Sequence, residues 1–281
     1  MYNIQSFSSL IELNNKTLTS VASSQINGLK VLYDNQWYIC GNLALNEGEF
    51  PHKAINSSPD DLDYQLLIRA ALLLSKEKTS QPVVLTVGFP YSTYLIYKEK
   101  AVNNLIGTHK IEFDASVFGG GSKSSFMIDV KEVNVLPEII GCTIALRRGE
   151  ENAQGRFFVL SCGFGTFESL LSSEEGIIEQ SMISTHGIKY AINLALNELS
   201  KTHYMEFRSP HLLDEAFQKG YIILNRKRID LREIRKNAIT NYYNEIISPY
   251  LKEVINDTNL MKTNKIYLTY ICLILPIQLR K

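Results

Sequence analysis

The chain has 281 residues, 45% of them apolar, which is enough to bury the core of one large domain or two modest ones. Basic and acidic residues number 29 each, so the net charge predicts no attraction of the whole chain to nucleic acid or to a membrane surface. Four cysteines (Cys40, Cys142, Cys162, Cys272) lie far apart without a Cys-x-x-Cys pair. This spacing indicates reduced thiols at core positions of a cytoplasmic protein.

The two ends of the sequence predict neither a secretory signal nor a membrane anchor. Residues 1–16 lack the basic start and the apolar stretch of a signal peptide. Residues 266–277 are apolar, but they are shorter than the roughly 20 residues that cross a bilayer, and Pro276 interrupts them. We therefore interpret this segment as a buried strand followed by an apolar tail.

Strands and helices alternate along the chain, and hairpins followed by helices occur twice. The expected elements are strands at 30–33 and 36–39, a helix at 60–74, strands at 82–88, 108–113 and 126–135, a helix at 137–148, strands at 157–160, 167–171 and 177–183, a helix at 188–199, helical periodicity over 230–254 and a last strand at 265–269. This order indicates an α/β protein with two similar lobes.

Several of these elements carry local signals. Asp34-Asn35 is typical of a tight hairpin turn. The apolar run at 82–88 predicts a central strand buried on both faces, and it ends at Gly88-Phe89-Pro90, where open α/β sheets commonly bind ligands. Gly119-Gly120-Gly121 is followed by no lysine-threonine pair, so a flexible hairpin loop explains it better than a phosphate loop. Ser248-Pro249 is expected to interrupt the long helical stretch.

The segment with the most specific pattern is the turn Gly163-Phe164-Gly165-Thr166, which joins two apolar strands. Glycines in such a turn allow backbone N–H groups to approach phosphate oxygens, because a Cβ atom would block the contact. By itself the turn is also compatible with an ordinary hairpin.

This stretch resembles the second phosphate loop of actin, heat-shock chaperones and sugar kinases, whose pattern is Asp-x-Gly-x-Gly-Thr-x-Asp/Glu. Gly163, Gly165, Thr166 and Glu168 match the pattern, and Ser161 stands in the place of the leading aspartate. In that superfamily the aspartate holds the magnesium ion of the nucleotide through its water shell. A serine hydroxyl can contact such water but carries no charge that would neutralise the metal.

Further segments resemble ParM/StbA-type bacterial actin-like proteins. They are Gly41-Asn42-Leu43-Ala44, Val87-Gly88-Phe89-Pro90 and Pro137-Glu138-Ile139-Ile140-Gly141. The resemblance implies that Glu138 orients the attacking water, although an acid at a helix N-terminus also favours the helix dipole. It also implies that Gly187 faces the nucleotide, whereas His186 is better explained as a capping or loop residue.

The resemblance implies an α/β, actin-like (ribonuclease H-like) two-lobed fold with mixed sheets flanked by helices, its first strands incomplete. The first lobe is expected over residues 1–136 and the second, opened by the linking helix, over 137–281. The implied function is a filament-forming protein of the plasmid-segregation type that binds ATP with Mg²⁺ and, if active, hydrolyses it. Self-association and a DNA-binding adaptor are the implied partners, without direct contact to nucleic acid or membrane.

Two departures from the family pattern concern the nucleotide. The first phosphate loop, D-x-G-x-x-x-x-K, has no counterpart before residues 6–10, and Tyr270 to Leu275 follow Thr269 where a Gly-Gly pair for adenosine is expected. These departures predict a sequence truncated at both ends, with exposed apolar edges and an impaired nucleotide site. A non-catalytic actin-like binding module is therefore the alternative, and a sugar kinase or chaperone fits the short chain less well.

Other chemistries find little support in the sequence. A serine-hydrolase elbow at Ser161 requires glycine at the position of Val159. Cys162 with His186 could form a nucleophile pair, but the apolar neighbours of Cys162 favour a buried thiol. The five histidines lack metal-ligand spacing, so no metal site is expected from the protein alone. Residues 226–228, Arg-Lys-Arg, are interpreted as a solvated surface beside a helix.

Overall fold

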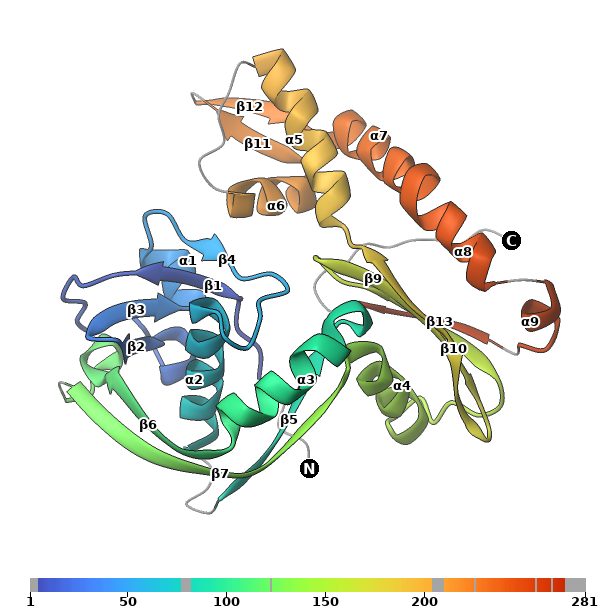
Figure 1. Cartoon of the computed structure of the whole chain (residues 1–281). Helices are drawn as coiled ribbons and strands as arrows, with labels where there is room; N and C mark the ends of the chain where they lie inside the picture. The colour runs from blue at the N-terminus through green and yellow to red at the C-terminus, as the bar shows by residue number, and fades with distance from the viewer. Residues whose placement is uncertain are drawn as a thin grey trace. The chain divides into compact units, whose positions relative to one another are not determined.

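The computed structural model describes residues 5–76, 82–121, 123–203, 210–224, 226–255, 257–263 and 265–270. The chain divides into two compact units, drawn in Figure 1. Unit 1 is built from the residues up to Val87 and from Ile96–Val135. Unit 2 is built from Gly88–Leu95 and from most of the chain after Leu136. Both units contain mixed strands and helices, so the predicted α/β class is confirmed.

Unit 1 contains a seven-stranded sheet in the order β4-β1-β3-β2-β6-β7-β5. Its elements are Leu10–Leu13 (β1), Lys30–Tyr33 (β2), Gln36–Cys40 (β3), Asn42–Glu47 (α1), His52–Lys53 (β4), Leu62–Lys76 (α2), Val83–Phe89 (β5), Tyr91–Leu105 (α3), Gly107–Asp114 (β6) and Lys123–Pro137 (β7), with short 3₁₀ turns at Gln25–Asn27 and Ala115–Phe118. Three of these elements, β5, α3 and β7, have residues in both units.

The sheet of unit 1 is held by an apolar layer beneath α2. Leu66 and Leu73 of α2 are almost completely buried in one cluster with Val31 of β2 and Ile111 of β6. The β2–β3 hairpin turns on Asp34-Asn35, both with positive φ (48° and 59°), as its sequence predicts.

The strand β5 differs from its prediction. Its sequence predicts a central strand buried on both faces, but β5 is the last strand at one edge of the sheet, and Val84 is 60% exposed. A mostly β-branched run favours extended backbone, but it does not by itself fix the position of a strand within a sheet. The helix α3 directly after Pro90 was also not predicted.

Unit 2 contains a four-stranded sheet in the order β10-β9-β8-β13 and a separate two-stranded hairpin. Its elements are Glu138–Arg148 (α4), Phe157–Cys162 (β8), Thr166–Ser173 (β9), Gly176–His186 (β10), Lys189–His203 (α5), Pro210–Lys219 (α6), Tyr221–Leu224 (β11), Lys227–Asp230 (β12), Arg232–Tyr242 (α7), a π-helical turn at Tyr243–Ile247, Ser248–Val254 (α8), Asp257–Met261 (α9) and Lys265–Tyr270 (β13).

Helices cover both faces of this sheet. Phe157 and Val159 of β8 pack with Ile139 of α4, and the intervening Phe158 packs with Val254 of α8. This alternation follows from the pleat of a strand, which sends successive side chains to opposite faces. The strands β8, β9 and β10 are antiparallel neighbours, whereas β13 joins β8 in parallel, so the sheet is mixed.

Other parts of unit 2 correct the sequence analysis. The strands β11 and β12 and the helix α6 were not predicted. Arg226 lies in the turn of the β11–β12 hairpin, and Lys227 and Arg228 begin β12. The irregularity in the long helix falls at Tyr243–Ile247, directly before Ser248-Pro249, and the chain stays helical through it. Of the apolar segment at 266–277, the strand part is observed up to Tyr270 and the remainder lies outside the described residues.

The thiols agree with the sequence analysis only in part. Cys40 is fully buried, Cys142 and Cys162 are half-buried, and all three are free; Cys272 lies outside the described ranges. Within the described ranges, every helix is too short or too polar to cross a bilayer.

Candidate functional site

A row of polar residues crosses the four-stranded sheet on the face covered by α4. The strand registers place Thr269 of β13 beside Ser161 of β8, Ser161 beside Glu168 of β9, and Glu168 beside Ser184 of β10. Residues two positions away in β8 and β9 pack against α4, so Ser161 and Glu168 share that face. Four residues from four strands thus form one continuous polar line within an apolar core.

Glu168 is the most constrained member of this row. Its side chain is 2% exposed, and its carboxyl accepts hydrogen bonds from the N–H of Tyr91 at 2.5 Å and from the N–H of Ile139. Tyr91 begins α3 and Ile139 lies in the first turn of α4, so one carboxyl group satisfies donors at two helix N-termini. Burial raises the pKa of Glu168 to about 7, and the charge of Glu138 adds to the rise while these hydrogen bonds oppose it.

Glu138 begins α4, next to Pro137, and is half-buried. Burial raises the pKa of its carboxyl group. Gly88 lies against it, because a Cβ atom at Gly88 would be 3.1 Å from Cγ of Glu138. Because Gly88 has no side chain, the end of β5 can lie close to the start of α4.

Ser161 and Cys142 form the other end of the site. Ser161 is 2% exposed, and hydrogen bonds link the thiol of Cys142 to the hydroxyl groups of Ser161 and Thr269. Burial raises the pKa of the Cys142 thiol, so it stays protonated near neutral pH. Burial also raises the pKa of Cys162 to about 11, which argues against Cys162 as a nucleophile.

The glycine turn is joined to the start of α5 by backbone hydrogen bonds. The N–H groups of residues 187–189 donate to the carbonyl oxygens of residues 163–165 at 3.0–3.1 Å, and Gly163 N–H donates to the Thr166 oxygen at 2.8 Å. A Cβ atom at Gly187 would lie 2.5 Å from the Gly163 oxygen and 2.6 Å from the Thr166 nitrogen. Only glycine permits this approach, so Gly187 closes the turn onto α5.

Aromatic rings lie beside this junction. The rings of His186 and Tyr190 stack with centroids 6.0 Å apart, and Tyr190 meets Tyr242 of α7 at the same separation. Tyr242 donates from its hydroxyl to the His186 carbonyl at 2.7 Å, and the Tyr190 hydroxyl donates to Glu245 at 2.7 Å. His186 is therefore the end of β10 and part of an aromatic stack.

The structure brings the predicted site residues together within unit 2. Ser161 and Glu168 are neighbours on the face of the sheet that α4 covers, and Glu138 at the start of α4 interacts with Glu168. The turn with Gly163, Gly165 and Thr166 follows β8 directly and is hydrogen-bonded to Gly187. Sequence reasoning missed Cys142, Thr269, Ser184 and Tyr91. No sequence signal could have indicated them, because their proximity depends on strand register and on the helix packed above the sheet.

The glycine turn offers a backbone donor that fits a nucleotide phosphate. The Gly165 N–H has no backbone acceptor in the described part of the chain, so it can donate to a phosphate oxygen. The described residues contain no group of three histidine, cysteine or acidic side chains that could hold a metal ion by themselves. Near the turn, Ser161 offers only an uncharged hydroxyl that already contacts Cys142.

Comparisons with known proteins agree with this fold. Residues 3–141 match the family model of the actin-like proteins N-terminal domain. Among solved structures, a pCBH ParM non-polymerisable quadruple mutant matches with a TM-score of 0.75 at 15% identity, over 94% of this chain and 81% of that one. A 15-stranded ParM filament from Clostridium botulinum gives 0.72 at 14% identity, with coverages of 94% and 81%.

The archaeal actin homologue Ta0583, solved in complex with ADP, gives a TM-score of 0.71 at 14% identity, over 94% of this chain and 79% of that one. At these identities the structural matches show the fold alone. A search of curated protein sequences returns no match.

The close contact at Gly187 predicts unequal responses to two glycine substitutions. Gly187→Ala should lower the free energy of unfolding by about 2 kcal/mol or more, because its Cβ meets backbone atoms that cannot move aside. Gly141→Ala is the control: in α4 its Cβ would meet only Leu136 at an ordinary 3.5 Å, and alanine favours a helix by about 1 kcal/mol. Urea unfolding measures both, and equal stabilities would contradict the proposed role of Gly187.

The raised pKa of Glu168 predicts a pH-dependent stability. The folded state holds the proton more tightly than the unfolded state, so the contribution to stability is greatest below pH 4.5 and is lost as pH rises to about 7. Glu168→Gln removes this titration and keeps an acceptor for the Tyr91 N–H. As pH rises from 4.5 to about 7, the free energy of unfolding of the variant should increase relative to that of the unmodified chain by on the order of 3 kcal/mol.

Chemical denaturation at a series of pH values tests this expectation. The control is Glu179→Gln, an exposed glutamate of β10. A stability difference between Glu168→Gln and the unmodified chain that stays constant from pH 4 to 8 would contradict it.

Proposed function

We propose that the chain is a filament-forming subunit with a weak nucleotide site, because residues 3–141 match the actin-like family model and the whole chain has the fold of the ParM proteins. The observation that carries the proposal is the glycine turn at 163–166, joined to Gly187 and followed by the buried Glu168. In this arrangement the Gly165 N–H has no backbone acceptor among the described residues, and two acidic groups, Glu138 and Glu168, interact with each other.

The ligand that best fits is ATP accompanied by Mg²⁺. The phosphates would meet the turn formed by Gly163, Gly165 and Thr166, where glycine allows contact with backbone N–H groups. Mg²⁺, when bound, would neutralise phosphate charge, and Ser161 with Glu168 would contact its water shell. The ADP complex of the archaeal homologue with the same fold supports a nucleotide as the ligand class.

The chain's own residues support slow hydrolysis. Glu138 is the candidate catalytic residue, and its raised pKa brings its carboxylate closer to the range in which it can accept a proton from water. Ser161 provides no negative charge for the metal, and its hydroxyl contacts Cys142. We therefore propose weak ATP binding and slow turnover.

The two units support the proposed two-lobed organisation, with lobes at 1–136 and 137–281. The main boundary lies between Val135 of unit 1 and Leu136 of unit 2, although Gly88–Leu95 also belongs to unit 2, and Pro210 and His211 to unit 1. The proposed setting is the cytoplasm and plasmid segregation, with a DNA-binding adaptor as partner. The ParM filament that shares this fold supports self-association as the central property.

Sedimentation of the full chain with and without Mg-ATP tests the proposed function. We expect filaments that pellet in larger amount with Mg-ATP, and electron microscopy of the pellet should show them. Assembly that is indifferent to nucleotide would support the alternative of a non-catalytic actin-like module, which the contact between Ser161 and Cys142 favours. Absence of assembly under both conditions would contradict the filament proposal.

Restoring a charge at position 161 should strengthen nucleotide binding. Ser161→Asp is expected to tighten Mg-ATP binding by about tenfold in isothermal titration, since a carboxylate can balance the metal charge. Ser161→Asn has the same shape without the charge and should bind like the unmodified chain. Micromolar binding by the unmodified chain, or equal affinities of the two variants, would contradict this assignment.

A further inference from the structure

Basic residues are concentrated in one stretch of unit 2. Residues 219–236 contain seven basic and two acidic residues, whereas residues 149–181 contain six glutamates and one arginine. Figure 1 shows the β11–β12 hairpin of the basic stretch and the β9–β10 turn of the acidic stretch at opposite ends of unit 2. The net charge of zero for the whole chain therefore conceals a local excess of positive charge around the hairpin.

A hollow with a volume of about 370 Å³ lies within this basic stretch. It is formed where the end of α6, the strand β12 and the start of α7 meet, and it is lined by Lys219, Gly220, Arg228, Asp230 and Arg232. The volume is at the small end of the range of ligand pockets, about 300–1,000 Å³. Because three of the lining residues are cations and one is an anion, the hollow suits a small ligand with negative charge.

The backbone around the hollow is held by hydrogen bonds between α6 and α7. Gly220 follows α6 with a positive φ of 74°, and its N–H donates to the Ala216 oxygen at 2.8 Å. The Gly220 oxygen accepts from the Leu231 N–H at 2.9 Å, and Arg235 donates to two carbonyl oxygens in the last turn of α6, both at 3.1 Å. A ligand would therefore bind to a lining that is already ordered, which reduces the entropy lost on binding.

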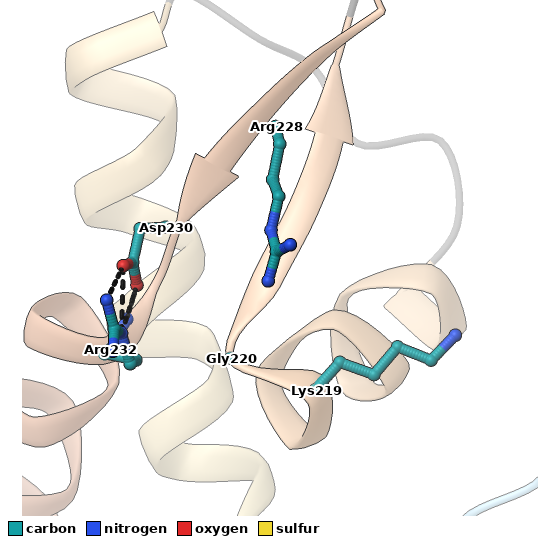
Figure 2. A pocket seen from close by; sticks show the side chains of 5 residues that line it. All are labelled: Lys219, Gly220, Arg228, Asp230 and Arg232. Atoms are coloured by element: carbon teal, nitrogen blue, oxygen red, sulfur yellow. Dashed lines mark hydrogen bonds and ion pairs between the residues drawn. The ribbon is translucent and has the colours of Figure 1, made fainter.

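Arg228 is the lining cation that is best placed to bind a ligand. Its guanidinium lies over the ring of Tyr221, 4.0 Å from the centroid, which fixes its orientation. Figure 2 shows the Arg228 side chain extending toward Gly220, with the Asp230–Arg232 pair to one side. Among the described residues, Arg228 forms no ion pair. An oriented guanidinium of this kind can donate two parallel hydrogen bonds to one oxyanion.

The other charged residues of the lining show that an anion is stabilised in this position. The carboxylate of Asp230 accepts hydrogen bonds from the backbone and the guanidinium of Arg232 at 2.5–3.0 Å. These hydrogen bonds, together with the charges of Arg232 and Arg228, lower the pKa of Asp230 to about 2. Lys219 pairs with Glu215 at 2.5 Å. Two of the three lining cations thus have an acidic partner close by, and Arg228 is the one whose charge is left for a ligand.

We propose that this hollow binds a small phosphate-bearing molecule, with the phosphate group held by Arg228 and flanked by Arg232 and Lys219. A phosphate monoester carries up to two negative charges and three acceptor oxygens, which matches cations from three elements better than a planar carboxylate does. The hollow has the volume of roughly a dozen water molecules, more than one phosphate group fills, so a phosphate ester with an organic part fits best. The hollow shares no residue with the glycine turn at 163–166, and the inference does not depend on the proposed function.

Isothermal titration of the full chain with glucose 6-phosphate and with inorganic phosphate tests the site. We expect saturable binding of one glucose 6-phosphate per chain, with a Kd in the millimolar range or below. Arg228→Gln should weaken this binding by about tenfold or more, because it removes the oriented guanidinium. Arg228→Lys keeps the charge without the paired donors and should weaken it less, by roughly threefold.

The matched control is Arg226→Gln. It removes an exposed cation from the turn of the same hairpin, but Arg226 does not line the hollow, so the variant should bind glucose 6-phosphate like the unmodified chain. Thermal unfolding verifies that every variant is folded.

Four results would overturn the inference. The first is that neither phosphate probe binds at millimolar concentration. The second is equal weakening by Arg226→Gln and Arg228→Gln, which indicates a general attraction to the basic stretch. The third is that succinate binds as tightly as glucose 6-phosphate, which indicates a carboxylate site. The fourth is that a labelled DNA duplex displaces glucose 6-phosphate and both glutamine variants lose the duplex equally, which indicates a nucleic-acid surface. None of these results bears on filament formation, which sedimentation tests separately.

Discussion

The arrangement of unit 2 depends most directly on the hydrogen bonds that the carboxyl group of Glu168 accepts. It projects from β9 and receives N–H groups from the beginnings of α3 and α4, two helices that are 48 positions apart at Tyr91 and Ile139. Helix N-termini carry unsatisfied donors and a partial positive charge, so one acidic side chain can satisfy both. This arrangement requires a buried carboxyl group, whose charged form is destabilised by the loss of water. The pKa of Glu168 is raised for this reason.

The same carboxyl group belongs to the polar row through Thr269, Ser161, Glu168 and Ser184. The row lies on the α4 face of the sheet, next to the apolar side chains of Phe157, Val159 and Leu170. Polar groups inside a core are destabilising unless they are paired, and here hydrogen bonds connect most of the row to its surroundings. A site built in this way is rigid and close to backbone N–H groups, which suits recognition of a charged ligand better than attack by a nucleophile.

The distribution of charge gives unit 2 a direction. Seven of its basic residues fall within 18 positions around the β11–β12 hairpin, whereas glutamates dominate residues 149–181. Surface ion pairs within one chain contribute little to its stability, so unpaired charge at two ends is inexpensive to keep. The same charges act strongly on the orientation and rate with which a partner approaches. The glycine turn on the sheet and two stretches of opposite charge thus belong to the same unit.

The sequence by itself determined the class of the fold and the glycine turn. Gly163, Gly165 and Thr166 are local, since their spacing creates the turn whatever packs above it, and the tight turn at Asp34-Asn35 is equally local. The sequence misplaced β5, because an apolar run determines extended backbone but not position in a sheet. Only the tertiary structure brings Glu168 to Tyr91 and Ile139, and Cys142 to Ser161 and Thr269. It also places the basic and the acidic stretches apart from each other. These relations depend on strand register and helix docking, which join residues far apart in the chain and leave no local pattern to read.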